Sequence, residues 1–261
     1  RSFFSLSAAA FYFCARAYLS ICMTDPATPT SSLRTHIERN LQRASAQRVR
    51  ALFAEINPHL VGDKLFENRW SEQRKEAAVL IPIIDRAEGP SVLMTVRAHD
   101  MPSHAGQISF PGGRVHDGDA TRIDTALRET EEEVGIPRDR VDVIGALGDH
   151  KGGLGFSVTP VIGIVPGDIE LSLCAREVAE AFEAPLSFVA ELSNHIVEER
   201  EHKGVTYNMF AAPYDGYHIW GLTAGILRSL AEVLQDADKT LFNRLSNHGD
   251  LNSGLSGGHE R

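Results

Sequence analysis

Hydrophobic residues between positions 33 and 56 recur mostly three or four residues apart, which predicts one or two amphipathic helices. The pattern changes at about residue 78, where a continuous apolar run to residue 84 predicts a buried strand. A Gly-Pro turn follows, and residues 91–97 predict a strand beside the first one. The first part of the chain therefore predicts helices followed by paired strands.

The rest of the chain mixes strand and helix patterns without a regular alternation. Helical spacing predicts helices at 121–135 and 221–234, and residues 177–189 predict a short helical or turning segment. Apolar or alternating stretches predict strands at 107–110, 141–147, 157–165, 195–201, 205–212 and 217–220. This order favours the α+β class, with a mixed sheet flanked by helices.

Composition changes toward both ends of the chain. Residues 24–32 are rich in Pro, Ser and Thr and predict a disordered tail, and the Gly-, Ser- and Asn-rich end predicts fraying. We therefore expect four regions, namely a leader or tail at 1–32, a helical extension at 33–72, the main domain at 73–240 and a flexible tail at 241–261.

Residues 1–22 are apolar, contain serine and carry no acidic residue. Arg16 interrupts the roughly 20 apolar residues that a spanning helix needs. A secretory signal and an organelle transit peptide are the other interpretations. We interpret the segment as translated upstream sequence with the start at Met23. This interpretation predicts a cytoplasmic protein, whereas a genuine transit peptide would place it in an organelle.

Composition and charge exclude several classes of protein. Hydrophobic residues make up 43% and charged residues 23% of the chain, which is typical of a folded globular protein rather than a membrane protein. The formal charge of −9 argues against nucleic-acid binding, which favours a basic surface. The three cysteines have no zinc-finger or CxxC spacing, so we expect a reducing compartment and no structural disulfide.

The predicted helix at 121–135 carries four glutamates in five positions. Glu129, Glu132 and Glu133 stand at positions i, i+3 and i+4 and share one face, whereas Glu131 points elsewhere. The stripe that packs on the sheet is expected to consist of Ile123, Ala126, Leu127, Thr130 and Val134. Thr121 is a suitable N-cap, and Gly135 before Ile136-Pro137 is a suitable end.

The shared face has two explanations. By itself it favours an ordinary solvated acidic helix. Clustered carboxylates are also the oxygen ligands that Mg²⁺ or Mn²⁺ prefers, and such ions commonly bridge a protein to substrate phosphates. Arg128 stands beside Glu129, where its fork of donors can orient the carboxylate. The glycine pair Gly112-Gly113 lets the backbone approach a ligand closely.

This stretch resembles the Nudix box, G-x5-E-x7-R-E-U-x-E-E-x-G-U with U apolar. The residues that match its second half are Arg128, Glu129, Glu132, Glu133, Gly135 and Ile136. Gly113 and Asp119 keep the five-residue gap of the first half, but eight rather than seven residues separate Asp119 from Arg128, which weakens any role for Asp119. Thr130 stands where the family has an apolar residue.

The preceding stretch resembles a motif of the coenzyme A pyrophosphatase branch of Nudix hydrolases, L-L-T-x-R-[SA]-x3-R-x3-G-x3-F-P-G-G. The matching residues are Leu93, Thr95, Arg97, Ala98, Gly106, Phe110, Pro111, Gly112 and Gly113. Met94 replaces a leucine, and Pro102 replaces the second arginine, which puts one anion contact in doubt. Together the two motifs imply a Nudix-like α/β/α sandwich.

The resemblance implies metal-dependent hydrolysis of the diphosphate of coenzyme A, or of a derivative, to 3′,5′-ADP and 4′-phosphopantetheine or its acyl form. The alternatives are a Nudix hydrolase for NADH, ADP-ribose or a nucleoside triphosphate, and a Nudix-fold binding protein without catalysis. The implied cofactor is Mg²⁺ or Mn²⁺. We expect a small nucleotide substrate, no nucleic-acid or membrane partner, and leave a homodimer open.

The resemblance also implies roles for particular residues. Glu129, Glu132 and Glu133 are the expected metal ligands, and Arg128 positions the first of them. A box glutamate or Glu177 is the expected general base. The expected substrate contacts are Arg97, His104, Gly112 and Gly113. Phe156 and Tyr207 are candidates for packing against adenine, although both fit a core role better. His116 and His150 match no zinc motif and receive no metal role.

Overall fold

The computed structural model describes residues 29–64, 67–68, 74–100, 105–152, 155–202, 204–238 and 241–242. The expectations for residues 1–28, for His104 and for the end of the chain from residue 243 lie outside these ranges. None of the helices within the described ranges combines the length and apolar character that a membrane crossing requires.

An eight-stranded mixed sheet forms the centre of the molecule, with the central order β3-β2-β1-β7-β5. Strand β1 pairs in parallel with β7 and antiparallel with β2 and β4. Three strands form a separate antiparallel sheet in the order β11-β10-β9. The strands are β1 Lys75–Arg86, β2 Gly89–Arg97, β3 Ile108–Ser109, β4 Gly112–Arg114, β5 Asp142–Ala146, β6 His150–Lys151, β7 Phe156–Pro166, β8 Val178–Pro185, β9 Ile196–His202, β10 Val205–Tyr214 and β11 Tyr217–Trp220.

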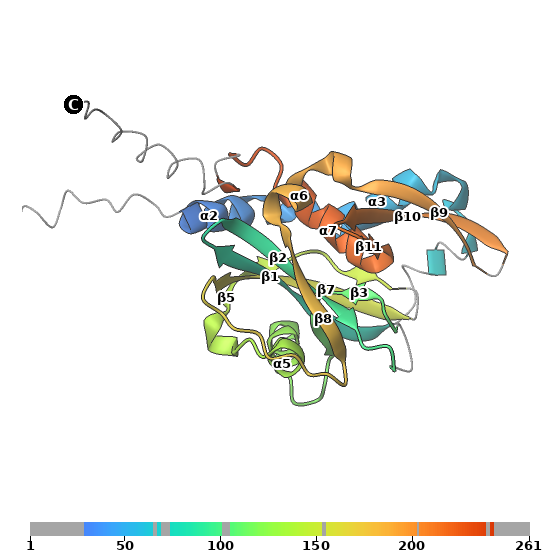
Figure 1. The fold of residues 1–261 in the computed structure, drawn as a ribbon. Coiled ribbons are helices and arrows are strands. Elements are labelled where there is room, and N and C mark those ends of the chain that lie inside the picture. Colours follow the sequence, from blue (N-terminus) through green and yellow to red (C-terminus); the bar gives the residue numbers. More distant parts are fainter. Residues whose placement is uncertain are drawn as a thin grey trace, which may run out of the picture.

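Helices cover both faces of the main sheet, as Figure 1 shows with α5 on one side and α7 and α2 on the other. Apolar residues of β1 and β7 alternate between the two faces, so each face buries its own core. The expected α+β sandwich is therefore confirmed. The helices are α2 Pro29–Asn40, α3 Ala46–Ile56, α5 Arg122–Val134, α6 Leu186–Ala190 and α7 Gly221–Val233, with 3₁₀ turns η1 Leu41–Ala44, η2 Pro58–Leu60, η3 Arg138–Arg140 and η4 Leu192–Asn194.

The N-terminal helices are part of the core. Leu33 and Ile37 of α2 are buried in the same cluster as residues of α7. The end of α3 is attached to β10 through Asn57, whose amide donates to the carbonyl of Asn208 at 3.0 Å and whose Oδ1 accepts from the Asn208 amide at 2.6 Å. Helix α2 begins at Pro29, so the expected disordered tail was wrong for residues 29–32; proline is compatible with the first turn of a helix.

Residues 178–185 form strand β8, so the prediction of a helical or turning segment at 177–189 was wrong for most of its length. Glutamate and alanine are good helix formers, so the sequence of this segment favours a helix. The strand nevertheless buries Val178, Phe182 and Ala184 on one face through its two-residue alternation. The long antiparallel ladder with β2 overrides the local propensity. Only the following turn, α6, is helical.

His150 is a structural residue beneath α7. Its side chain is buried, its Nδ1 lies 2.8 Å from the carbonyl oxygen of Gly148, and its Nε2 lies 3.0 Å from the Ser229 hydroxyl and 3.3 Å from the carbonyl oxygen of Gly225. Burial lowers the pKa of His150 from 6.5 to about 4, so the imidazole is neutral in the folded protein.

His150 is expected to make the stability depend on pH. Between pH 6.5 and 4 the unfolded imidazole binds a proton that the folded one does not, so the free energy of unfolding falls as the pH falls, by up to about 1.4 kcal/mol per pH unit for one proton. Urea unfolding across this range should give a shallower pH dependence for His150→Gln than for the wild type. Parallel curves for the two proteins would contradict the assignment.

Candidate functional site

Two glycines let strand β4 come close to both β1 and α5. Gly112 has φ +152°, and a Cβ there would lie 2.5 Å from the Cα of Val79. A Cβ on Gly113 would lie 2.5 Å from each carboxylate oxygen of Glu129. A side chain at position 112 would clash with the backbone of β1, whereas one at position 113 would displace the Glu129 carboxylate, so Gly113 leaves the space that this carboxylate fills.

Helix α5 has the ends that the sequence predicts. The Thr121 hydroxyl accepts from the Asp124 amide at 3.2 Å, and Gly135 adopts the left-handed conformation with φ +74°. Ala126, Thr130 and Val134 are buried against the sheet, whereas Ile123 is 36% exposed and was wrongly assigned to that face. The Thr130 hydroxyl donates to the carbonyl of Ala126 at 2.7 Å, which explains how a polar residue occupies an apolar position.

Arg128 connects the loop before α5 to the acidic face of the helix. Its Nε and Nη2 each donate to one carboxylate oxygen of Asp119 at 3.0 Å, and its Nη1 donates to Glu129 at 2.8 Å. The contact to Glu132 is longer, at 3.4 Å. The planar guanidinium therefore fixes two carboxylates at once, in the bidentate geometry that arginine favours.

Asp119 has a larger structural role than the loop length suggests. Its side chain is 6% exposed, and it also accepts from the Thr125 hydroxyl at 2.8 Å and the His116 amide at 2.9 Å. The hydrogen bonds from Arg128 and from the His116 amide hold the pKa of Asp119 well below its usual range.

Glu133 is the most buried carboxylate of the helix, with 3% of the residue exposed. Its Oε2 accepts from the Gly112 amide at 3.2 Å. Burial raises the pKa of Glu133 to about 7, against the effects of that hydrogen bond and of Arg97, while the negative charges of Glu129 and Glu177 add to the rise. Strand β2, helix α5 and the loop before β8 therefore bring Arg97, Glu129 and Glu177 within electrostatic reach of Glu133.

The loop before β8 is fastened to the end of α5, which places Glu177. The amides of Ser172 and Cys174 donate to the carbonyls of Val134 and Glu133, both at 2.9 Å. On the other side, the Ala98 amide donates to the carbonyl of Glu177 at 2.9 Å. These bonds use carbonyls that a helix end leaves unpaired, and they join Glu177 to the strand that carries Arg97.

The remaining acidic residues of the helix face solvent. Glu131 accepts from Arg138 at 2.9 Å away from the site, as expected. The side chain of Glu132 is 60% exposed. Within the described ranges, no group of three or more His, Cys, Asp or Glu side chains is arranged to hold an ion through protein ligands alone.

The donor chemistry of the site fits a hard divalent cation that takes further ligands from water and substrate. The carboxylates of Glu129 and Glu133 both lie beside the Gly112-Gly113 backbone, and a cation there would offset the repulsion between their negative charges. One or two carboxylates plus phosphate oxygens are the usual protein-bound environment of Mg²⁺. In the described part of the chain, the buried Nε of Arg97 has no hydrogen-bond partner, which leaves a donor beside these carboxylates.

The predicted site residues thus fall into three groups. Arg97, Arg128, Glu129, Glu133, Glu177 and the two glycines come together, Glu132 lies at the exposed edge, and His104 is outside the described residues. The sequence interpretation underestimated Asp119. It also missed Arg122, which fixes the start of α5 by donating to Asp149 at 3.0 Å and to Thr159 at 3.0 Å.

Comparisons with known proteins agree with this geometry. Residues 74–196 match the NUDIX domain family. The uncharacterized Nudix hydrolase NudL of Cronobacter sakazakii is 44% identical over 164 residues, which cover 63% of this chain and 85% of the relative. The protein of the same name from Escherichia coli strain K12 is 43% identical over 164 residues, with the same coverage.

A solved structure also resembles this chain. The Nudix hydrolase RenU of M. smegmatis is 20% identical, covers 63% of this chain and 88% of its own, and superposes with a TM-score of 0.43. Nudix hydrolases use divalent metal ions and cleave nucleoside diphosphate derivatives. The box motif lies on α5 and β4, and the chain covers 85% of a relative that is 44% identical to it. The chain therefore belongs to the Nudix hydrolase family.

Proposed function

We propose that this protein hydrolyses the diphosphate bond of coenzyme A or of its derivatives, with Mg²⁺ or Mn²⁺ as the cofactor. The products are 3′,5′-ADP and 4′-phosphopantetheine, or the acylated phosphopantetheine. The upstream motif from Leu93 to Gly113 supports this substrate over other nucleoside diphosphate derivatives.

The observation that carries the proposal is the position of Arg97. This residue belongs to the upstream motif, lies at the end of β2, and acts electrostatically on Glu133 of the box. Its buried and unpartnered Nε would find a partner in a phosphate oxygen. A buried donor without a partner costs free energy, so a diphosphate bound there would supply the hydrogen bond that this Nε lacks among the described residues.

The residues of the chain support hydrolysis in separate ways. A divalent ion, when bound by Glu129 and Glu133, would neutralise the diphosphate oxygens and lower the pKa of an attacking water. Arg128 and Asp119 keep Glu129 in its orientation, and Arg97 attracts the anionic substrate. Glu177 reaches the same site from the loop before β8 and is a candidate to accept the proton of the attacking water. The oxygen of that water forms the new bond to phosphorus, and the bridging P–O bond breaks.

Substrate preference is tested by incubating the full chain with coenzyme A, acyl-CoA, NADH and ADP-ribose, each with and without Mg²⁺ or Mn²⁺. We expect metal-dependent release of 3′,5′-ADP from coenzyme A or its acyl form at the highest kcat/KM, measured by chromatography of the products. Faster turnover of NADH or ADP-ribose would show that coenzyme A is not the preferred substrate. If none of these substrates is turned over, with or without the metal ions, a Nudix-fold binding protein without catalysis is favoured.

Glu133→Gln should lower kcat by about a hundredfold or more, because the substitution removes a charge that the metal and the substrate require. The variant keeps the size of the buried side chain, and circular dichroism should show an unchanged fold. Glu131→Gln on the solvent-facing side of the same helix is the matched control and should keep wild-type kcat. Equal activity of both variants would remove Glu133 from the site.

Asp119→Asn tests whether Asp119 positions Arg128. The variant loses one charged acceptor of the bidentate pair, so kcat should fall about tenfold while the KM for coenzyme A stays nearly constant. Asp117→Asn, at an exposed position in the same loop, is the control and should behave like the wild type. The positioning role would be contradicted if KM changed as much as kcat. It would also be contradicted if Asp117→Asn lost kcat to the same extent.

A further inference from the structure

Strand β9 lies at the edge of the small sheet. Among the described residues it pairs with β10 along its whole length, and no strand pairs with its other side. Figure 1 shows the β9–β10 hairpin at the end of the molecule away from α5. An edge strand presents a row of backbone N–H and C=O groups to a further strand. The outer side of β9 therefore has the geometry to extend the small sheet.

Two large apolar side chains are exposed at the start of this edge. Ile196 is 43% exposed and Val197 is 48% exposed. They are consecutive in the strand, so their side chains lie on opposite faces of the sheet. A further strand along β9 would cover apolar surface on both faces, which favours its binding.

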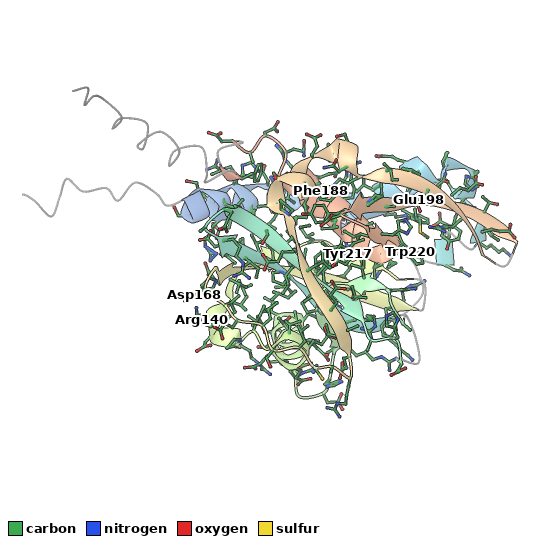
Figure 2. All side chains as sticks on the ribbon, in the orientation of Figure 1. Arg140, Asp168, Phe188, Glu198, Tyr217 and Trp220 are labelled. Carbon is green, nitrogen blue, oxygen red and sulfur yellow. The ribbon has the colours of Figure 1, made fainter. Side chains whose placement is uncertain are left out.

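Opposite charges alternate along one face of β9. Glu198 and Arg200 lie two residues apart on this face, and the Arg200 guanidinium donates to Glu198 at 2.8 Å. Figure 2 shows Glu198 and Trp220 in this part of the molecule, and the Arg200 guanidinium lies over the Trp220 ring at 5.4 Å. Nε2 of His218 lies 3.0 Å from Glu198. These contacts hold both charges in place at the edge.

The symmetry of a homodimer limits how this edge can pair with itself. When a two-fold axis relates two antiparallel copies of one strand, the axis passes between a residue and its own copy. Full overlap of β9, which spans residues 196–202, places this axis at Glu199. Glu198 then lies opposite Arg200 of the second copy, and Arg200 lies opposite its Glu198. The longest overlap thus creates two pairs of opposite charge on one face.

Neighbouring registers are less complementary. An axis at position 198 places Glu198 opposite its own copy, and an axis at position 200 does the same for Arg200. Full overlap has one contact of like charge, between Glu199 and its own copy on the other face. Charged side chains on an edge strand commonly oppose pairing with other strands. On β9 their alternating sign opposes the shifted registers and favours the full overlap.

We propose that β9 is the interface of a homodimer in which the β9 strands of two copies pair antiparallel about Glu199 and join their small sheets into one continuous sheet. The inference does not depend on the proposed hydrolysis, because β9 belongs to the small sheet and carries none of the candidate site residues. One strand pair with few flanking side chains is a small interface, so the dimer is expected to depend on protein concentration.

Sedimentation velocity of the full chain tests the dimer over a concentration range of about 1 to 100 μM, where small interfaces associate. We expect the weight-average mass to rise with concentration from the mass of one chain toward that of two. A mass that stays at one chain throughout would overturn the proposal and leave a strand of another protein as the partner of this edge.

Two charge reversals and their mixture test the register. Glu198→Arg places arginines opposite each other and Arg200→Glu places glutamates opposite each other, so each variant alone should stay monomeric where the wild type is dimeric. An equimolar mixture restores both pairs of opposite charge and should dimerise. Circular dichroism and thermal unfolding check that each variant is folded. Dimers of either variant alone, or a mixture that stays monomeric, would contradict the register.

Glu199→Gln should strengthen the dimer. The substitution removes the contact of like charge at the axis, so the dimer Kd should fall about two- to fivefold. A damaged fold cannot imitate this gain. The controls Glu170→Arg and Arg39→Glu change the charge at exposed positions in the loop between β7 and β8 and on α2, and should keep the wild-type Kd. An unchanged or higher Kd for Glu199→Gln would show that the strands do not pair about this residue.

Discussion

The paired hydrogen bonds between Arg128 and Asp119 determine how the acidic helix meets the rest of the molecule. Asp119 belongs to the loop before α5, and the guanidinium that it holds also donates to Glu129. The side chains of Arg128, Asp119 and Glu129 are all largely buried, so water does not compete effectively for these bonds. The loop, the helix and the first carboxylate therefore adopt one arrangement before any cation or substrate arrives.

The rest of the site is built around this pair by contacts between distant segments. Gly112 lets β4 lie close to β1, Gly113 leaves room for the Glu129 carboxylate, and the loop at 172–177 pairs with the last carbonyls of α5. Arg97 arrives from β2 because that strand pairs with both β3 and β8. Three segments far apart in sequence thus supply one cluster of charges. Burial raises the pKa of Glu133, and the negative charges of Glu129 and Glu177 add to the rise.

Local sequence determined the elements whose physics is local. The start and end of α5 and the outward position of Glu131 follow from helix periodicity and capping, and the structure has all of them. Tertiary structure decided what depends on register and pairing across the sheet. Residues 178–185 became a strand because β2 supplied a partner, and Asp119 became buried because its loop folds back onto Arg128. Each of these outcomes requires hydrogen bonds or burial between segments distant in sequence, and no spacing within one segment encodes them.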